Sequence, residues 1–501
     1  MKNTKIGLSF NHLKEDLPAG LVVFLVALPL CLGIALASGA PLFSGIIAGI
    51  VGGIIVALAS GSSLSVTGPA AGLTVIVLNG ILDLGNYNTF LLAVVIAGVL
   101  QIILGFLKAG IIGYYFPSSV IKGMLAAIGI ILILKLAPVA IGYAKGAAVP
   151  YLLTSIIIAS ISIAIILIWD IPAFKKYIIF KWVPGALIAV LVGTFINEYI
   201  YIIDPALKLS ESQLVKLPVS NNINEFLSYF TLPNFNEFAN PKVYILAFTI
   251  AIIASLESLL CTEAADKLDP QKRITPTNRE LKAQGLGNVL SGLLGGLPVT
   301  AVIVRTSANV NAGAKTKLSA IVHGFLLLLS VLFMASILNK IPLACLSAVL
   351  LVVGYKLAKV SLFKQMYKLG WEQFVPFIIT IVAIQFSDLL KGIALGMMVA
   401  IFYILRANYR RDYIIHHEKK STGGNIKIIL TEHVTFLNKG SLAIKLSEIT
   451  PNSNVIIDGS NAHYIDLDIL EIIYNFKSIS INKNIQVELI NLPEFKGSFG
   501  H

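Results

Sequence analysis

The sequence predicts an all-α polytopic membrane protein of about fourteen transmembrane segments, followed by a small α/β domain. Of its 501 residues, 56% are apolar and 13% are charged, about half the charged fraction of a soluble domain. Apolar stretches long enough to cross a bilayer recur between residues 19 and 408. From about residue 420 onward, charged residues and asparagine become frequent and short isoleucine-rich runs indicate strands.

Glycine, proline or a few charges separate the expected membrane segments. So much apolar surface must face lipid, because one soluble core cannot hide it. We predict a cytoplasmic N-terminus at 1–18, a membrane domain at 19–408, a linker at 409–424 and a cytoplasmic domain at 425–501. The segments are 19–37, 42–59, 67–83, 90–108, 119–138, 151–169, 183–203, 242–262, 280–296, 298–311, 318–338, 341–360, 371–388 and 390–408.

Basic residues in the connections predict the orientation of the chain. Connection 264–282 is rich in lysine and arginine, whereas the longer connection 204–241 also carries several acids. The positive-inside rule places 264–282, the lysines of 1–18 and the arginines of 406–411 in the cytoplasm. Both termini are then cytoplasmic, which requires an even number of spans, and we expect a bacterial-type cell membrane.

Other features exclude several classes of protein. The net charge of +12 belongs to short connections and chain ends, so no nucleic-acid partner is expected. Cys31, Cys261 and Cys345 fall inside apolar runs, where we expect packing and no disulfide or metal site. The histidines lack zinc-site spacing and no phosphate-binding loop is present, so we predict no cofactor, no primary pump and no enzyme.

Two segments rich in glycine and proline lie at matching places in the two halves, at 66–72 and 295–301. They are about 229 residues apart, and the spans 19–37 and 242–262 are offset by nearly the same amount. This predicts repeats at about 19–203 and 242–408, inverted because each has an odd number of spans. Pro69 and Pro298 are expected to open short helices, where a missing N–H costs nothing.

Two interrupted helices predict an anion site between them. A helix broken at mid-membrane is tolerated only where it lines a cavity or packs inside protein. If the helices opening at Pro69 and Pro298 meet head to head, their N–H groups and positive dipole ends attract an anion. The expected substrate-binding residues are Thr67, Gly68, Pro69, Ala70, Pro298, Val299, Thr300, Ala301 and Arg305.

Arg305 is expected to add a full positive charge to this site. It should lie two turns, ~10 Å, beyond Pro298, with its side chain leaning toward the helix start. Its attraction for an anion is ~3–4 kcal/mol at an effective dielectric near 20. The alternative is a structural arginine paired with a helix C-terminus or a cytoplasmic carboxylate. Likewise, the hydroxyls of Thr67 and Thr300 either bind the anion or cap their helices.

Glu257 is the acid in the middle of an otherwise apolar span, where charged groups are costly and usually functional. Its carboxyl would exchange a proton coupled to anion movement, bind Na⁺, or pair with Arg305. Cys261, one turn further on, offers a thiol where a hydroxyl would suit Na⁺, which favours the proton. The expected coupling-ion residues are Glu257, Ser258 and Cys261.

Several short stretches match one family when taken together. They are 27–30 (ALPL), 37–39 (ASG), 67–69 (TGP), 256–260 (LESLL), 285–288 (GLGN), 295–298 (GGLP), 305–306 (RT) and 312–316 (AGAKT). On these stretches the chain resembles the sulfate permease (SulP) family of anion transporters over nearly its whole length. The resemblance implies core and gate domains built from two inverted seven-helix repeats, an anion between helices three and ten, and a homodimeric elevator.

The resemblance also bears on coupling and on the tail. Cyanobacterial bicarbonate carriers of this kind use Na⁺, with Asp at the position of Glu257 and Thr at that of Cys261, so this chain is more similar to the proton-coupled branch. Leu30 stands where many sulfate and halide relatives carry glutamine. The stretches 455–460 (VIIDGS) and 464–470 (YIDLDIL) resemble a STAS domain, which implies cytoplasmic contacts or a role in dimer stability.

The sequence therefore predicts a proton-coupled symporter of a small inorganic anion, bicarbonate or sulfate, surrounded by membrane lipid. The alternatives are a Na⁺-coupled bicarbonate symporter, an uncoupled exchanger or channel, and a carrier of dicarboxylates or nucleobases. Glu257 separates the coupled from the passive alternatives, because a passive pathway has no need of a titratable acid beside the site.

Overall fold

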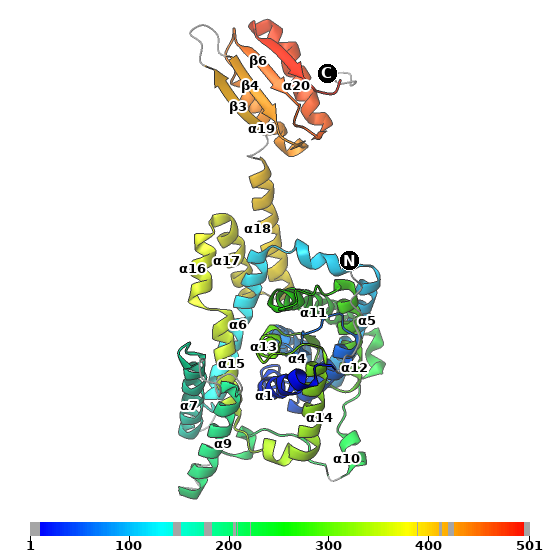
Figure 1. Cartoon of the computed structure of the whole chain (residues 1–501), viewed down its shortest axis with the longest axis vertical. Coiled ribbons are helices and arrows are strands. Elements are labelled where there is room, and N and C mark those ends of the chain that lie inside the picture. The colour runs from blue at the N-terminus through cyan, green and yellow to red at the C-terminus, as the bar shows by residue number, and fades with distance from the viewer. Residues whose placement is uncertain are drawn as a thin grey trace. The chain divides into compact units, whose positions relative to one another are not determined.

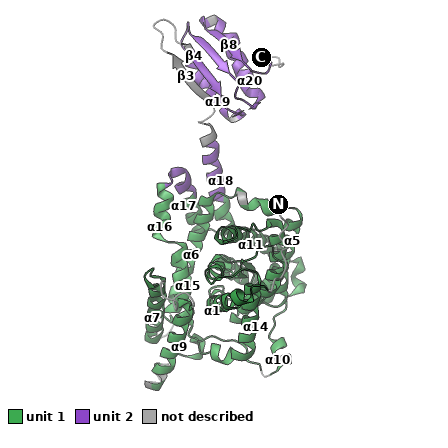
Figure 2. Cartoon of the chain, viewed as in Figure 1, with its two compact units in different colours: residues 1–368, 377–394 green, residues 369–376, 395–501 purple. Residues whose placement is uncertain are grey.

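A computed structural model describes residues 11–143, 152–174, 183–203, 207, 209–220, 222–387, 389–409, 413–418 and 425–494. Parts of the predicted N-terminus, of the linker and of the arginine group at 406–411 lie outside these residues. The chain divides into two compact units, residues 1–368 with 377–394 and residues 369–376 with 395–501 (Figure 2).

Helices make up nearly all of the first unit (Figure 1). Their ends follow local chemistry: Asn240 accepts the N–H of Lys242 where α11 begins, and Gly85 adopts a positive φ of 70° where α4 ends. The helices from the N-terminus to connection 204–241 are α1 (Leu13–Ala37), α2 (Leu42–Val51), the π-helical η1 (Gly52–Val56), α3 (Ala57–Ala59), η2 (Ala71–Leu73), α4 (Thr74–Leu84), α5 (Tyr87–Phe106), η3 (Ala109–Tyr115), α6 (Ser118–Ala140), α7 (Leu153–Asp170) and α9 (Gly185–Ile203). The later ones are η6 (Glu211–Gln213), α10 (Ile223–Ser228), η7 (Phe235–Ala239), α11 (Pro241–Leu268), α12 (Thr277–Leu293), α13 (Ile303–Asn311), α14 (Leu318–Leu338), α15 (Leu343–Leu357), α16 (Val360–Lys368), α17 (Trp371–Phe386) and α18 (Leu389–Tyr409). The start of α17 and most of α18 belong to the second unit.

The predicted membrane segments coincide one for one with helices of the structure. Nine stretches of the described residues are long and apolar enough to cross a membrane, and three shorter apolar helices are present at Ala71–Leu84, Gly185–Ile200 and Trp371–Phe386. The two remaining segments are α12 and α13, which are short and polar. The all-α polytopic fold is therefore confirmed, with the polar segments placed inside the bundle.

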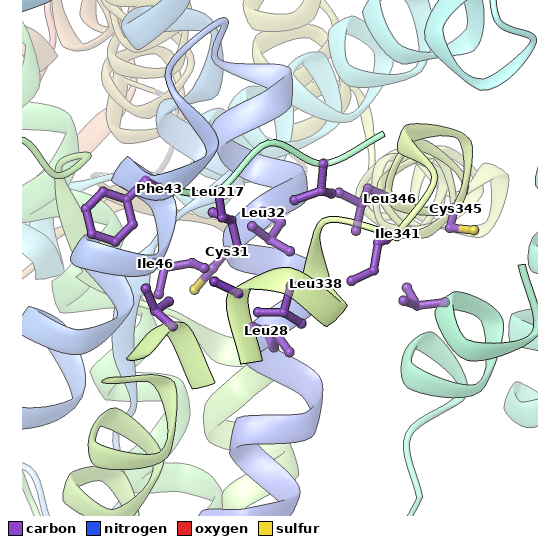
Figure 3. Packing of buried hydrophobic residues seen from close by; sticks show 14 of the residues in the cluster. Leu28, Cys31, Leu32, Phe43, Ile46, Leu217, Leu338, Ile341, Cys345 and Leu346 are labelled. Atoms are coloured by element: carbon purple, nitrogen blue, oxygen red, sulfur yellow. The ribbon is translucent and has the colours of Figure 1, made fainter. Parts of the chain in front are cut away.

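An apolar cluster in the first unit surrounds the middle of α1 (Figure 3). Leu28, Cys31 and Leu32 of α1 pack there with Phe43 of α2 and Leu338 of α14. Cys31 and Cys345 are both free and buried in this cluster, as expected for small packing residues. The cluster fixes the position of α1, and with it the position of Cys31.

The C-terminal part is a small α/β domain. Its strands are β3 (Tyr413–Glu418), β4 (Asn425–Leu430), β5 (His433–Val434), β6 (Asn454–Asp458), β7 (Tyr464–Ile465) and β8 (Gln486–Ile490), and its helical elements are η8 (Phe436–Asn438), α19 (Lys439–Ser447), α20 (Leu467–Ser480) and η9 (Ile481–Lys483). The main sheet has the order β3-β4-β6-β8, with β3 antiparallel to β4 and the other neighbours parallel. Apolar side chains of β4, β6, α19 and α20 form its core.

Candidate functional site

The two interrupted segments lie side by side in the first unit. Thr67–Pro69 forms β1 and Val299–Ala301 forms β2, and all residues of both strands are buried. The strands pair antiparallel, with Thr67 opposite Ala301 and Pro69 opposite Val299. The backbone N–H and C=O groups of these buried segments have no helical partner. They therefore pair with the segment from the other repeat.

The helices after these strands begin later than predicted. Pro69 lies within β1 and Pro298 immediately precedes β2, so neither proline opens a helix. Instead η2 begins at Ala71, and α13 begins at Ile303. Both helix starts nevertheless reach α11, where the N–H groups of Gly72 and Ile303 are bound by Glu257 and Cys261, one turn apart. A pairing between segments so far apart in the chain leaves no local pattern from which to predict it.

Arg305 lies in the first turn of α13, nearer to the helix start than predicted, and is completely buried. Its Nη2 donates to the Cys31 sulfur at 3.4 Å. Its Nε and Nη1 have no hydrogen-bond partner among the described residues. None of the ion pairs in the described part of the chain includes Arg305, so the structure does not support the carboxylate-paired alternative. A buried cation without a charged partner is costly and favours a negative ligand.

The Arg305 guanidinium packs directly against β1. A Cβ atom at Gly68 would collide with Nη1 of Arg305 and lie 3.1 Å from its Cζ. Only glycine leaves room for the guanidinium at this point of the strand. The charge is therefore held beside the β1–β2 pair, within the group of residues that the sequence singled out.

Helix α11 brings the three predicted coupling-ion residues to both helix starts. The Glu257 carboxylate accepts the N–H of Gly72 in η2, and its Oε2 is buried without a hydrogen-bond partner in the described chain. Ser258 Oγ accepts the N–H of Ala301 at 3.3 Å. The Cys261 sulfur accepts the N–H of Ile303, the first residue of α13. One face of α11 thus contacts both interrupted segments.

Two of the alternatives left open by the sequence can now be compared with the structure. Glu257 and Arg305, both within the described residues, do not form an ion pair, so they are not structural partners. Neither threonine caps its helix, because Ala70 and Val302 occupy the N-cap positions without a side-chain bond. Thr67 Oγ1 accepts from Gln284 at 2.9 Å, and Thr300 Oγ1 lies 3.3 Å from the Ala301 carbonyl.

Sequence reasoning missed three residues of this region. Cys31 was expected only to pack, yet it also contacts Arg305. Gln284 and Asn288 of α12 bind the two strands, as Asn288 Oδ1 accepts the N–H of Val299 at 2.6 Å. A signal was present in the sequence, because polar residues at positions 280, 284 and 288 recur at helical spacing within a predicted membrane segment.

The fold and this site together define a class of protein: a multi-pass membrane transporter with two buried, interrupted segments paired with each other and a buried cation beside them. Residues 13–383, most of the chain, match the sulfate permease family. The chain belongs to the sulfate permease family and is a transmembrane anion transporter.

Known proteins of this family are similar over most of their length. The putative sulfate transporter YvdB of Bacillus subtilis is 28% identical over 411 residues, which cover 80% of this chain and 75% of that protein. The bicarbonate transporter BicA of a Picosynechococcus species is 29% identical over 412 residues, covering 78% of this chain and 70% of BicA.

Two solved structures share the fold. The transmembrane domain of a cyanobacterial BicA superposes with a TM-score of 0.66 at 25% identity, covering 78% of this chain and 99% of that domain. The murine anion transporter Slc26a9 in an inward-facing state gives a TM-score of 0.78 at 17% identity, covering 97% of this chain and 87% of Slc26a9. The second likeness concerns the fold alone.

Proposed function

We propose that the chain is a proton-coupled symporter of a small oxyanion, bicarbonate or sulfate. The observation that carries the proposal is the unpaired guanidinium of Arg305, buried against Gly68 in the β1–β2 pair. Relatives named as sulfate and bicarbonate transporters support this class of substrate. An anion beside the strand pair supplies the negative charge that Arg305 lacks.

The coupling proposal starts from Glu257. Its carboxylate accepts the Gly72 N–H at the start of η2, so the ionised form adds negative charge close to the site. A proton on the unpartnered Oε2 removes that charge. Protonation and anion binding then favour each other, and this positive linkage is what symport of an anion with a proton requires.

Sodium is the alternative coupling ion, and the contacts of α11 favour the proton. Na⁺ is a hard cation that prefers several oxygen ligands. Ser258 Oγ already accepts the Ala301 N–H, and Cys261 offers a sulfur that accepts the Ile303 N–H. Only Glu257 retains a buried oxygen without a partner on this face among the described residues.

The remaining parts of the proposal concern assembly and location. We propose a homodimer in a bacterial cell membrane, with both termini in the cytoplasm and the core domain moving past the gate as an elevator. The basic connection 264–282 supports this orientation. Exposed aromatic side chains such as Phe386 and Phe402, 88% and 60% accessible, suit contact with lipid or a second copy. The STAS-like domain would make the cytoplasmic contacts.

Uptake into proteoliposomes tests the proposal. Labelled bicarbonate and labelled sulfate are each offered under an inward proton gradient, an inward Na⁺ gradient or no gradient, and protein-free liposomes correct for diffusion of CO₂. We expect accumulation of one of the anions under the proton gradient. Accumulation that needs the Na⁺ gradient would instead identify a sodium symporter.

Two variants with matched controls test the site. Arg305→Ala should raise the KM for the anion by more than about 100-fold, because its attraction for the anion, ~3–4 kcal/mol at an effective dielectric near 20, is lost. Arg406→Ala, outside the site, should not. Glu257→Gln should abolish accumulation driven by the proton gradient but keep exchange of preloaded anion, whereas Glu263→Gln, which removes an exposed partner of Lys267, should leave both intact. An unchanged KM in Arg305→Ala, or proton-driven accumulation in Glu257→Gln, would contradict the proposal.

A further inference from the structure

A stripe of buried polar side chains on α12 forms hydrogen bonds to the β1–β2 pair. Glu280, Gln284, Asn288 and Ser291 recur at intervals of one helical turn, and all four are completely buried. Asn288 and Ser291 bind the backbone at the start of β2, through Val299 and through the carbonyl of Leu297 just before the strand. Gln284 reaches β1. Burying a polar helix face costs free energy. We therefore expect its hydrogen bonds to have a role that apolar packing could not fill.

Glu280 is the first residue of this stripe, and several hydrogen bonds hold its carboxylate in place. Its carboxylate accepts hydrogen bonds from the Ser60 hydroxyl, from the Gly61 N–H and from Gln284 Nε2, the last at 2.8 Å. The positive charge of Lys317, whose Nζ donates to the Ser60 carbonyl at 2.8 Å, acts on the same carboxylate. These three donors use the carboxylate oxygens of Glu280 as acceptors and hold the side chain in place.

Glu280, as an acceptor, determines how the amide of Gln284 is oriented. The amide nitrogen has two hydrogens, and one of them goes to Glu280. The opposite orientation would set Oε1 against the carboxylate, with two acceptors facing each other. In the observed orientation Oε1 has no partner among the described residues, which shows that the contacts of the nitrogen decide the orientation.

The second hydrogen of Gln284 Nε2 goes to Thr67 Oγ1 at 2.9 Å. The threonine oxygen is therefore used as an acceptor, and its own hydrogen must be donated elsewhere. Among the described residues Thr67 donates to no other group, and in β1 it is the neighbour of Gly68, against which the Arg305 guanidinium packs.

We propose that Gln284 is a positioning residue for the transported anion: held by Glu280, it occupies the acceptor side of the Thr67 hydroxyl, so that this hydroxyl donates its hydrogen to the anion. The proposal rests on the anion site described under the proposed function. It assigns to α12 a role in substrate affinity, in addition to its role in packing.

A double-mutant cycle on anion uptake tests this role, because Gln284 acts only through Thr67. Gln284→Met keeps the length of the side chain and removes the amide, and Thr67→Val removes the hydroxyl. We expect each single variant to raise the KM about three- to tenfold, the value of one hydrogen bond, with little change in maximal rate. In the Thr67→Val background, Gln284→Met should then have no further effect.

Gln101→Met is the matched control, because Gln101 is also a buried glutamine but binds Ser255 and Asn288. Any effect it has on KM should add to that of Thr67→Val. If Gln284→Met folds poorly, Glu280→Gln provides the second variant, since a neutral amide at 280 no longer fixes the orientation of Gln284. It should raise the KM in the same non-additive way.

The outcomes separate this inference from the proposed function. If Thr67→Val leaves the KM unchanged, the anion does not contact β1 and the placement of the site itself is wrong. If Thr67→Val raises the KM but Gln284→Met and Glu280→Gln either leave it unchanged or act additively, the site stands and the positioning role is refuted.

Discussion

The sulfur of Cys31 lies 3.4 Å from Nη2 of Arg305 and so links α1 to the first turn of α13. A thiol is a weak acceptor, which leaves the positive charge of the guanidinium almost uncompensated. We therefore expect the residue at position 31 to affect how strongly Arg305 attracts an anion. A stronger partner there would compete with the substrate.

Cys31→Asp should greatly weaken anion binding, because a carboxylate at this position pairs with Arg305. The attraction it neutralises is ~3–4 kcal/mol at an effective dielectric near 20, so we expect the KM for uptake to rise by more than about 100-fold. Cys31→Asn is the control, with the same size and no charge, and should change the KM far less. Equal KM values for the two variants would show that charge at position 31 does not matter.

Gly68→Ala should stop transport by displacing the guanidinium. The added Cβ would collide with Nη1 of Arg305, and overpacking of this kind costs about 1–3 kcal/mol. We expect a lower melting temperature in detergent and loss of uptake. Adding Arg305→Ala should restore the melting temperature but not uptake, since the obstacle and the charge are removed together. Gly33→Ala, which meets the flexible end of Leu350, is the control.

The membrane helices could be predicted because their signal is local. A segment such as 90–108 is apolar along nearly its whole length, and burial in lipid needs no knowledge of a partner. Arg305 and Glu257 could be singled out for a related reason, as charged groups in apolar surroundings are costly wherever they pack. The sequence therefore identified the candidate site residues without their geometry.

The arrangement of the site could not be predicted, because it depends on contacts between distant segments. The pairing of Gly68 with Thr300 joins two strands of three residues each, too short for an alternating pattern. The contact between Cys31 and Arg305 spans 274 positions of the chain. Proline at 69 and 298 predicted helix starts, since nothing local shows that the backbone pairs with another repeat first.

Asn288→Ala should destabilise the protein and impair transport together. Asn288 binds both backbone groups of Val299, accepting its N–H at 2.6 Å and donating to its carbonyl at 3.1 Å. Leaving both buried groups without partners costs about 2–4 kcal/mol. The melting temperature in detergent should fall. The KM for uptake should rise, because β2 is no longer held in place.

Asn339 provides an unusually close control for this variant. It binds both backbone groups of Leu217 in the same way, at 2.6 and 2.9 Å, but Leu217 lies in the connection 204–241. Asn339→Ala should lower the melting temperature and leave the KM near its normal value. If both variants alter the KM alike, the effect reflects general loss of stability and not the position of β2.

Asp458 should make the C-terminal domain sensitive to acid. The Lys427 ammonium, 2.8 Å away, and the Ser460 hydroxyl and N–H lower the pKa of Asp458 from 3.8 to about 2. A carboxyl whose pKa is lower in the folded state stabilises the fold above its unfolded pKa, and this stabilisation disappears as the pH falls from about 4 towards 2.

Hydrogen exchange in β6 of the full-length protein should therefore be faster in Asp458→Asn than in the unmodified chain at neutral pH, and the difference should vanish below about pH 2. Asp468→Asn, which removes an exposed partner of Lys439 at 3.5 Å, should leave exchange in β6 unchanged. A difference for Asp458→Asn that persists at the lowest pH would mean that the ion pair with Lys427 is not its cause.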